Sequence, residues 1–152
     1  MTLSVEEHTG PREDLRALFE LAEDSAQQLD SYLDAGRVLV ARSDAQIVGH
    51  LQLVGREIKN MAVLASHRRR GIGRALVAAA IDLARDETPT TLVVATAAAD
   101  VDNLRFYQRL GFRMRSIERD AFTPATGYEA GIDVDGIELR DRVWLDLPLD
   151  PR

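Results

Sequence analysis

Residues 57–96 read as strand, glycine turn, helix and strand, and this order constrains the fold more than any other part of the chain. Residues 57–64 are predicted as a strand, and residues 71–85 as a helix whose apolar side chains fall on one face. Residues 90–96 are rich in β-branched and apolar side chains, which is typical of a buried central strand. Because a helix joins the two strands, they are expected to pair in parallel as a βαβ unit.

The rest of the pattern adds antiparallel strands and short helices around this unit. Residues 11–35 carry apolar stripes at helical spacing and are predicted as two short helices. Two strands joined by a tight turn at Asp44 and Ala45 predict a hairpin. The two strands of this hairpin are predicted at 37–42 and 46–54. The remaining predicted elements are a helix at 103–110 capped by Asp100 or Asp102 and ended by Gly111, strands at 112–122 and 142–147, and a loop at 123–141. The chain of 152 residues is therefore expected to form one α/β domain, residues 1–152, with a mixed sheet layered against helices.

Composition excludes several classes of function. A net charge of −6 argues against non-specific nucleic-acid binding. Without cysteine there is no disulfide, no thiolate metal site and no covalent cysteine intermediate, and no His/Asp cluster has the spacing of metal ligands, so no metal is expected. No apolar run approaches the ~18 residues of a membrane span, and the first residues lack a signal-peptide pattern. A cytoplasmic protein without membrane contact is expected.

An arginine- and glycine-rich turn, Arg68-Arg69-Arg70-Gly71-Ile72-Gly73, opens the predicted helix at 71–85. Backbone N–H groups at a helix start lack intrahelical acceptors, the helix dipole adds positive charge there, and glycine permits a close approach. Gly73 is followed by Arg74 and Ala75, which excludes a P-loop, and Leu76 excludes the dinucleotide fingerprint. Two interpretations remain, a phosphate cradle of the form Arg-x-x-Gly-x-Gly and a basic turn that only caps the helix.

A second motif, Asn-x-x-Phe-Tyr-x-x-x-Gly-Phe, occupies residues 103–112. Each position alone could be a helix cap or a core residue. Together with Arg68, Gly71 and Gly73 in the preceding turn, however, the string resembles the GNAT acyl-CoA N-acyltransferases over residues 45–122. The segments 128–132 and 136–141 are similar to a prokaryotic branch whose acceptors are mostly unassigned. The resemblance implies the GNAT fold, an α/β (α+β layered) architecture with a mixed, mostly antiparallel sheet of six to seven strands flanked by about four helices.

The resemblance also implies acetyl-CoA as co-substrate and a set of residues that contact it. Main-chain groups of Met61 and Val63 would pair with the pantetheine amides, in the manner of an added strand. Asn103 would contact the cofactor arm. The pyrophosphate would be held by the turn and the helix start, at Arg68, Arg69, Arg70, Gly71, Gly73 and Arg74.

The implied reaction is acetyl transfer to a primary amine by direct attack in a ternary complex. Tyr107 would protonate the departing thiolate, and its reference pKa of ~10 keeps it protonated at neutral pH. Glu57 precedes Met61 by four residues, which predicts the same strand face, and it would deprotonate the amine. The alternatives are an ordinary strand-end glutamate at position 57, or His50 or His67 as the base.

The acceptor is expected to be an amine on a small molecule, peptide or protein. The two N-terminal helices and the loop at 123–141 are expected to set specificity. The helical region is acidic, which suits either a cationic amine or a solvated face, at Glu20, Glu23, Asp24, Asp30 and Asp34. A homodimer is implied only by analogy with the family. The alternative functions are a non-catalytic acyl-CoA-binding sensor or regulatory module, and a nucleotide-binding loop.

Overall fold

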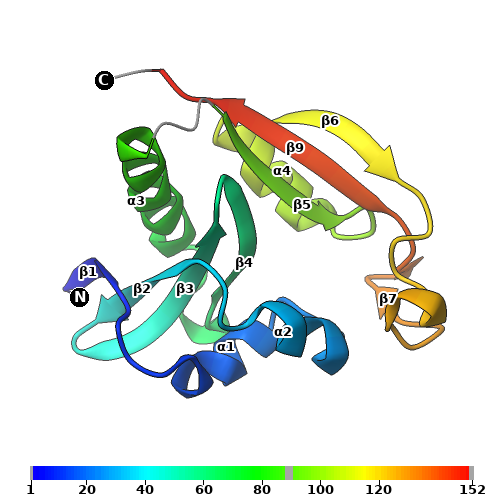
Figure 1. Ribbon diagram of the computed structural model, residues 1–152, viewed down its shortest axis with the longest axis horizontal. Coiled ribbons are helices and arrows are strands. Elements are labelled where there is room, and N and C mark those ends of the chain that lie inside the picture. The colour runs from blue at the N-terminus through cyan, green and yellow to red at the C-terminus, as the bar shows by residue number, and fades with distance from the viewer. Residues whose placement is uncertain (1, 88–90, 151–152) are drawn as a thin grey trace.

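A computed structural model describes residues 2–87 and 91–150 of the chain. Within them, a seven-stranded sheet runs in the order β1-β2-β3-β4-β5-β9-β6, and every neighbouring pair is antiparallel except β4 and β5 (Figure 1). The predicted mixed, mostly antiparallel sheet is confirmed. Its strands are β1 (Leu3–Glu7), β2 (Arg37–Ser43), β3 (Gln46–Val54), β4 (Glu57–Val63), β5 (Thr91–Ala97), β6 (Arg113–Glu118) and β9 (Arg142–Pro148).

Helices cover both faces of the sheet. They are α1 (Arg16–Glu20), α2 (Ala26–Tyr32), α3 (Ile72–Asp86) and α4 (Val101–Arg109), with 3-10 turns at Arg12–Leu15, Ala65–His67 and Pro124–Thr126. The alternation along β2 shows how the layers arise. Val38 and Val40 pack with Phe19 of α1, whereas Leu39 and Ala41 join the larger cluster around α3. One strand therefore anchors helices on opposite faces because its side chains alternate.

The parallel seam between β4 and β5 is short. Only Glu57 with Val93 and Ile58 with Val94 pair across it, whereas β5 and β9 pair along the whole length of β5. Beyond these two pairs the strands diverge, as Figure 1 shows. The remainder of β4, up to Val63, pairs with β3 alone among the described residues.

Several predicted boundaries were wrong. Strand β1 was missed, because it carries only two partly buried apolar side chains and lies at the sheet edge. The strand predicted at 112–122 ends at Glu118, and Asp120 then adopts a positive φ of 56°. The loop at 123–141 contains the small hairpin of β7 (Asp133–Val134) and β8 (Ile137–Glu138). Thr90, the predicted start of β5, lies outside the described residues.

Helix α4 begins two residues earlier than predicted. The Asp100 side chain accepts a hydrogen bond from the Asn103 backbone N–H at 3.1 Å, so Asp100 is the N-cap and Val101 the first helical residue. Of the two cap candidates, Asp100 is therefore confirmed. Asn103 consequently sits in the first turn of α4, with its side chain free to point away from the helix axis.

A layer of buried polar side chains lies between the sheet and the N-terminal helices. His50 and Gln52 are fully buried and Asn60 nearly so. The His50 ring stacks on Phe19 with centroids 4.3 Å apart, and its Nε2 lies 2.7 Å from Asn60 Oδ1. Because the Asn60 amide nitrogen donates to Phe19 O and to the Tyr32 hydroxyl, Oδ1 must accept and His50 Nε2 must carry the proton. His50 Nδ1 has no partner.

We expect His50 to make the fold acid-sensitive between pH 6.5 and 4. Burial lowers the pKa of His50 from 6.5 to about 4, so in this range the unfolded chain binds a proton that the native state does not. The contribution of neutral His50 to the free energy of unfolding is fully present above pH 6.5. The free energy of unfolding should fall by about 3 kcal/mol as the pH drops to 4. Urea titrations across this range measure it. A His50→Gln variant, which cannot titrate, should lose less stability over the same interval; an equal loss would contradict the assignment.

Candidate active site

The basic turn wraps around the N-terminus of α3. Gly71 is the N-cap, with a φ of 79°, and Arg69 has a φ of 63°, unusual for a side chain that is neither asparagine nor aspartate. The first hydrogen bond of the helix runs from Ala75 N to Gly71 O. The N–H groups of residues 72–74 therefore lack intrahelical acceptors and form a cradle of donors at the positive end of the helix dipole.

The two glycines of the turn serve different purposes. A Cβ at Gly71 would meet nothing within 4 Å, so Gly71 is needed for its positive φ and leaves open space in front of the helix. A Cβ at Gly73 would lie 3.1 Å from the Phe106 ring. Gly73 therefore lets α4 approach α3, and the two sequence motifs contact one another at this point.

The arginines predicted to bind phosphate surround this cradle. Arg68, Arg69, Arg70 and Arg74 are all exposed. Arg68 Nε donates to Val63 O at 3.3 Å, which ties the turn to the end of β4. A shallow groove of about 370 Å³ continues between α3 and α4, lined by Arg74, Val77, Ala78, Ile81, Arg109 and Leu110. Its two guanidinium groups extend the positive charge away from the cradle.

Tyr107 lies in α4, behind the cradle. It is 4% exposed and makes edge-to-face contacts with Phe106 and Phe112, at centroid distances of 5.0 and 5.5 Å. Its hydroxyl has no hydrogen-bond partner in residues 2–87 and 91–150. Burial, aided by the negative charge of Asp100, raises the pKa of Tyr107 well above its usual range. The hydroxyl therefore stays protonated at neutral pH and is available to donate.

Met61, Val63 and Asn103 lie at the open side of the β4–β5 seam. Met61 and Val63 are half-buried, follow the last pair with β5, and direct their side chains to the core around α3. The main chain at these residues has no partner strand on the β5 side among the described residues. The Asn103 amide nitrogen approaches Thr96 Oγ1 of β5 at 3.5 Å. These three residues therefore flank the point where the strands diverge.

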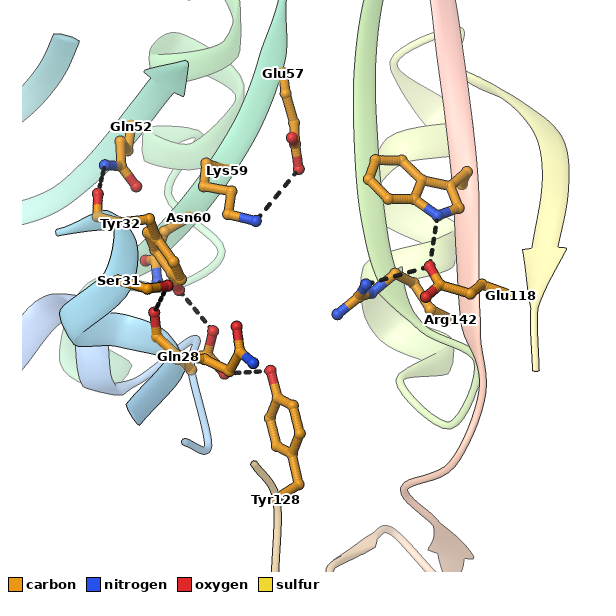
Figure 2. A network of polar contacts seen from close by, with 12 residues as sticks. Gln28, Ser31, Tyr32, Gln52, Glu57, Lys59, Asn60, Glu118, Tyr128 and Arg142 are labelled. Carbon is orange, nitrogen blue, oxygen red and sulfur yellow. Dashed lines mark hydrogen bonds and ion pairs between the residues drawn. The ribbon is translucent and has the colours of Figure 1, made fainter. Parts of the chain in front are cut away.

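Glu57 does not share a face with Met61, contrary to the sequence prediction. In the ladder with β3, Asn60 pairs with Gln52 and Ile58 with Leu53, so Lys59 is an extra, bulged residue. The bulge shifts the alternation by one, and Glu57 faces the side of Asn60 and the N-terminal helices. There its carboxylate lies 3.9 Å from Lys59 Nζ (Figure 2).

A hydrogen-bonded network extends from this face to the loop at 123–141. Glu23 accepts bonds from the hydroxyls of Tyr32 and Tyr128, both at 2.8 Å, and Asn60 donates to the Tyr32 hydroxyl at 3.0 Å (Figure 2). Burial raises the pKa of both tyrosines, so both hydroxyls remain donors. The sequence pattern singled out Glu23 as part of the acidic region and Tyr128 only within the segment at 128–132, and it missed Tyr32 and Asn60.

Asp24 belongs to the same acidic region. Burial and the nearby carboxylates of Glu23 and Asp100 raise the pKa of Asp24. Asp100 is also the charge that acts on Tyr107. The carboxylate of Asp100 therefore interacts electrostatically both with the acidic region of the N-terminal helices and with Tyr107.

The other candidates occupy separate places. His50 is buried and neutral, so it has no contact with solvent through which to take up a proton. His67 Nδ1 lies 2.8 Å from Ser66 Oγ in the turn before the cradle. Arg140, at the end of the loop at 123–141, pairs with Glu138. Within the described residues, no group of acidic and histidine side chains could hold a metal ion, and no helix is long and apolar enough to cross a membrane.

Comparison with known proteins identifies this arrangement. The family model described as "Acetyltransferase (GNAT) domain" matches residues 34–114, which include both motifs. The uncharacterised N-acetyltransferase YvbK of Bacillus subtilis (strain 168) is 32% identical over 142 residues, covering 89% of this chain and 90% of that protein.

Solved structures agree with this match. A GNAT family acetyltransferase from Elizabethkingia anophelis, with acetyl-CoA bound, has a TM-score of 0.88 and 30% identity, covering 97% of this chain and 98% of that one. A Bacillus subtilis acetyltransferase in complex with CoA has a TM-score of 0.88 and 31% identity, covering 98% of this chain and all of that one. The matched segment contains the basic turn before α3 and the tyrosine motif of α4, and the chain belongs to the GNAT family of acetyltransferases.

Proposed function

We propose that this single domain transfers an acetyl group from acetyl-CoA to a primary amine by direct attack in a ternary complex. The observation that carries the proposal is the divergence of β4 from β5 beside both the N–H cradle of α3 and the unpartnered hydroxyl of Tyr107. The related Elizabethkingia anophelis and Bacillus subtilis structures hold acetyl-CoA and CoA, respectively, which supports the choice of co-substrate.

This geometry supports a set of residues that would bind acetyl-CoA. The N–H groups of residues 72–74 and the surrounding arginines, Arg68, Arg69, Arg70 and Arg74, bind the pyrophosphate. Gly71 and Gly73, which lack side chains, leave room for the pyrophosphate to approach these N–H groups. The main chain at Met61 and Val63 pairs with the pantetheine amides, and Asn103 contacts the same arm. For the Val63 carbonyl to accept from the ligand, the Arg68 side chain must give up or share its hydrogen bond.

The reacting groups in this proposal are Glu57, the main chain at 61–63 and Tyr107. Glu57 takes a proton from the acceptor ammonium, directly or through a water, because the neutral amine is the nucleophile. An N–H of the strand at 61–63 donates to the carbonyl oxygen as negative charge develops on it. Tyr107 gives its proton to the departing sulfur. In the bound state, the thioester supplies the activated acetyl group.

Replacing Glu57 with glutamine should lower the rate of amine acetylation by ~10²-fold at neutral pH, because the amide cannot accept the proton. The loss stays at the lower end of the range for general bases because water can replace a half-exposed carboxylate. Thiol release from acetyl-CoA, measured against a panel of amines, gives the rate. Glu118→Gln, which removes the same charge on β6, is the matched control and should leave the rate within about twofold.

The same assay separates the enzyme from a binding module. If the wild-type protein binds acetyl-CoA but releases no thiol with any amine, and Tyr107→Phe changes nothing, the chain is an acyl-CoA-binding sensor or regulatory module. If it binds ATP and not CoA in a thermal-shift experiment, the turn before α3 is a nucleotide site and the proposal is wrong.

A further inference from the structure

Lys59 is the only lysine of the chain, and it lies at the apex of the fork between β4 and β5. The β3 ladder skips it as a bulge, and the β5 ladder ends one residue earlier, at Ile58. Its backbone therefore has no cross-strand partner in either register. The bulge turns its side chain to the face that carries Glu57, where the acceptor is proposed to bind.

Two contacts fix the position of the Lys59 ammonium. Nζ lies 3.9 Å from Glu57 Oε2 and 4.8 Å from the centroid of the Tyr32 ring. Figure 2 shows Lys59 pointing toward the carboxylate of Glu57, beside the Tyr32 ring. The Lys59 side chain keeps 35% of its surface exposed, so it is neither locked in the core nor free in solvent. An amine is thus held against the residue proposed to deprotonate the acceptor amine.

We propose that Lys59 is a self-acetylation site, at which the protein transfers an acetyl group from acetyl-CoA to its own Nζ within one chain. The inference rests on the proposed function, since it uses the same thioester and the same Glu57. No other lysine competes for the acetyl group, and arginine stays protonated and unreactive. The remaining amine is the α-amino group of Met1.

The step balances without a further reactant. The Nζ–C bond forms as the C–S bond of the thioester breaks. The ammonium loses two protons in becoming an amide. Glu57 takes the first and passes it to solvent, and the second replaces the proton that Tyr107 gives to the leaving sulfur, so that free CoA thiol is the other product. Lys59 ends as a neutral amide, which removes its ion pair with Glu57 and its contact with the Tyr32 ring.

The test is mass spectrometry of the purified full chain after incubation with acetyl-CoA and no added amine. We expect one acetyl group per chain. Trypsin cleaves after an unmodified Lys59 but not after its acetylated form, so the modification should appear on the uncleaved peptide of residues 57–68. The reaction should be first-order, with a rate that does not change on tenfold dilution of the protein, because donor and acceptor are held by one chain. Lys59→Arg keeps the positive charge and should take up no acetyl group at position 59, so trypsin should cleave it there completely.

Tyr107→Phe separates an enzymatic from a chemical modification, and should acetylate Lys59 ~10²-fold more slowly. Equal labelling of Tyr107→Phe, of urea-unfolded chain and of native wild type would mean adventitious chemistry and would overturn the inference. A rate proportional to protein concentration would overturn acetylation within one chain.

Failure of this inference can be told apart from failure of the proposed function in one sample. If the wild-type protein releases thiol with an added amine while Lys59 stays unmodified, self-acetylation is wrong and the proposed function stands. If neither an added amine nor Lys59 is acetylated, both are wrong.

Discussion

Replacing Tyr107 with phenylalanine should lower kcat by ~10²–10⁴-fold, the usual contribution of a positioned general acid. The ring contacts with Phe106 and Phe112 survive the change, since only the hydroxyl is removed. Because that hydroxyl has no partner in the described part of the chain, no internal hydrogen bond is lost and the free energy of unfolding should not fall. The affinity for acetyl-CoA should likewise stay within about twofold. Thiol release, urea titration and calorimetric binding measure the three quantities separately.

Tyr128→Phe is the matched control for this variant. The Tyr128 side chain is as buried as that of Tyr107, but its hydroxyl donates to the Glu23 carboxylate at 2.8 Å. Its removal should cost about 1.5–3 kcal/mol of stability, as expected for a bond to a charged group, and should affect the acceptor KM more than kcat. If Tyr107→Phe instead lost stability and kept its kcat, Tyr107 would be a core residue and the acid would have to be sought elsewhere.

Replacing Gly71 with aspartate should weaken the binding of CoA by ~10–10³-fold, corresponding to about 1–4 kcal/mol for a like charge placed close to the pyrophosphate. A Cβ at Gly71 meets no protein atom within 4 Å, so the new carboxylate would enter the open space in front of the α3 N–H groups. There it would repel the ligand and also accept the hydrogen bonds that the phosphate needs. Calorimetric titration with CoA measures the change.

Two controls isolate charge from backbone strain. Gly71→Asn has the same shape and tolerates a φ of 79° about as well as aspartate, so it should keep most of the affinity. Gly55→Asp adds the same charge at another open glycine with a positive φ, in the turn between β3 and β4, and should leave CoA binding unchanged. If Gly71→Asp and wild type bound CoA with equal affinity, the pyrophosphate would not bind in the cradle.

Sequence alone was sufficient for the elements with strong local signals. The helix from Ile72 to Asp86 follows from its apolar face, and β5 from its buried run. The contact between the two motifs, where Gly73 accommodates Phe106, was not predicted and is seen only in the structure. The two motifs are short, and each could be explained alone by capping and core packing. Their joint presence carried the family assignment.

The parts that sequence could not predict depend on register and on distant partners. The bulge at Lys59 leaves no mark in composition, yet it places Glu57 on the face opposite to the one predicted by simple alternation. Glu23 accepts hydrogen bonds from both Tyr32 and Tyr128, and its bond with Tyr128 joins residues 105 positions apart in the sequence. Such a pairing becomes visible only once the sheet order brings the loop at 123–141 beside the N-terminal helices.

The seam between β4 and β5 contains only two residue pairs among the described residues, which makes it the weakest join within the sheet. Backbone hydrogen bonding nearly stops there, so the two halves of the sheet are held together mainly by the side-chain cluster that includes Leu51 of one half and Leu145 of the other. A ligand bonded along the free edge of β4 would add backbone contacts at the weakest join of the sheet. Its binding energy would then add to the unfolding free energy by mass action. The rigidity of the whole sheet, measured by amide exchange on both sides of the seam, would become a function of ligand concentration.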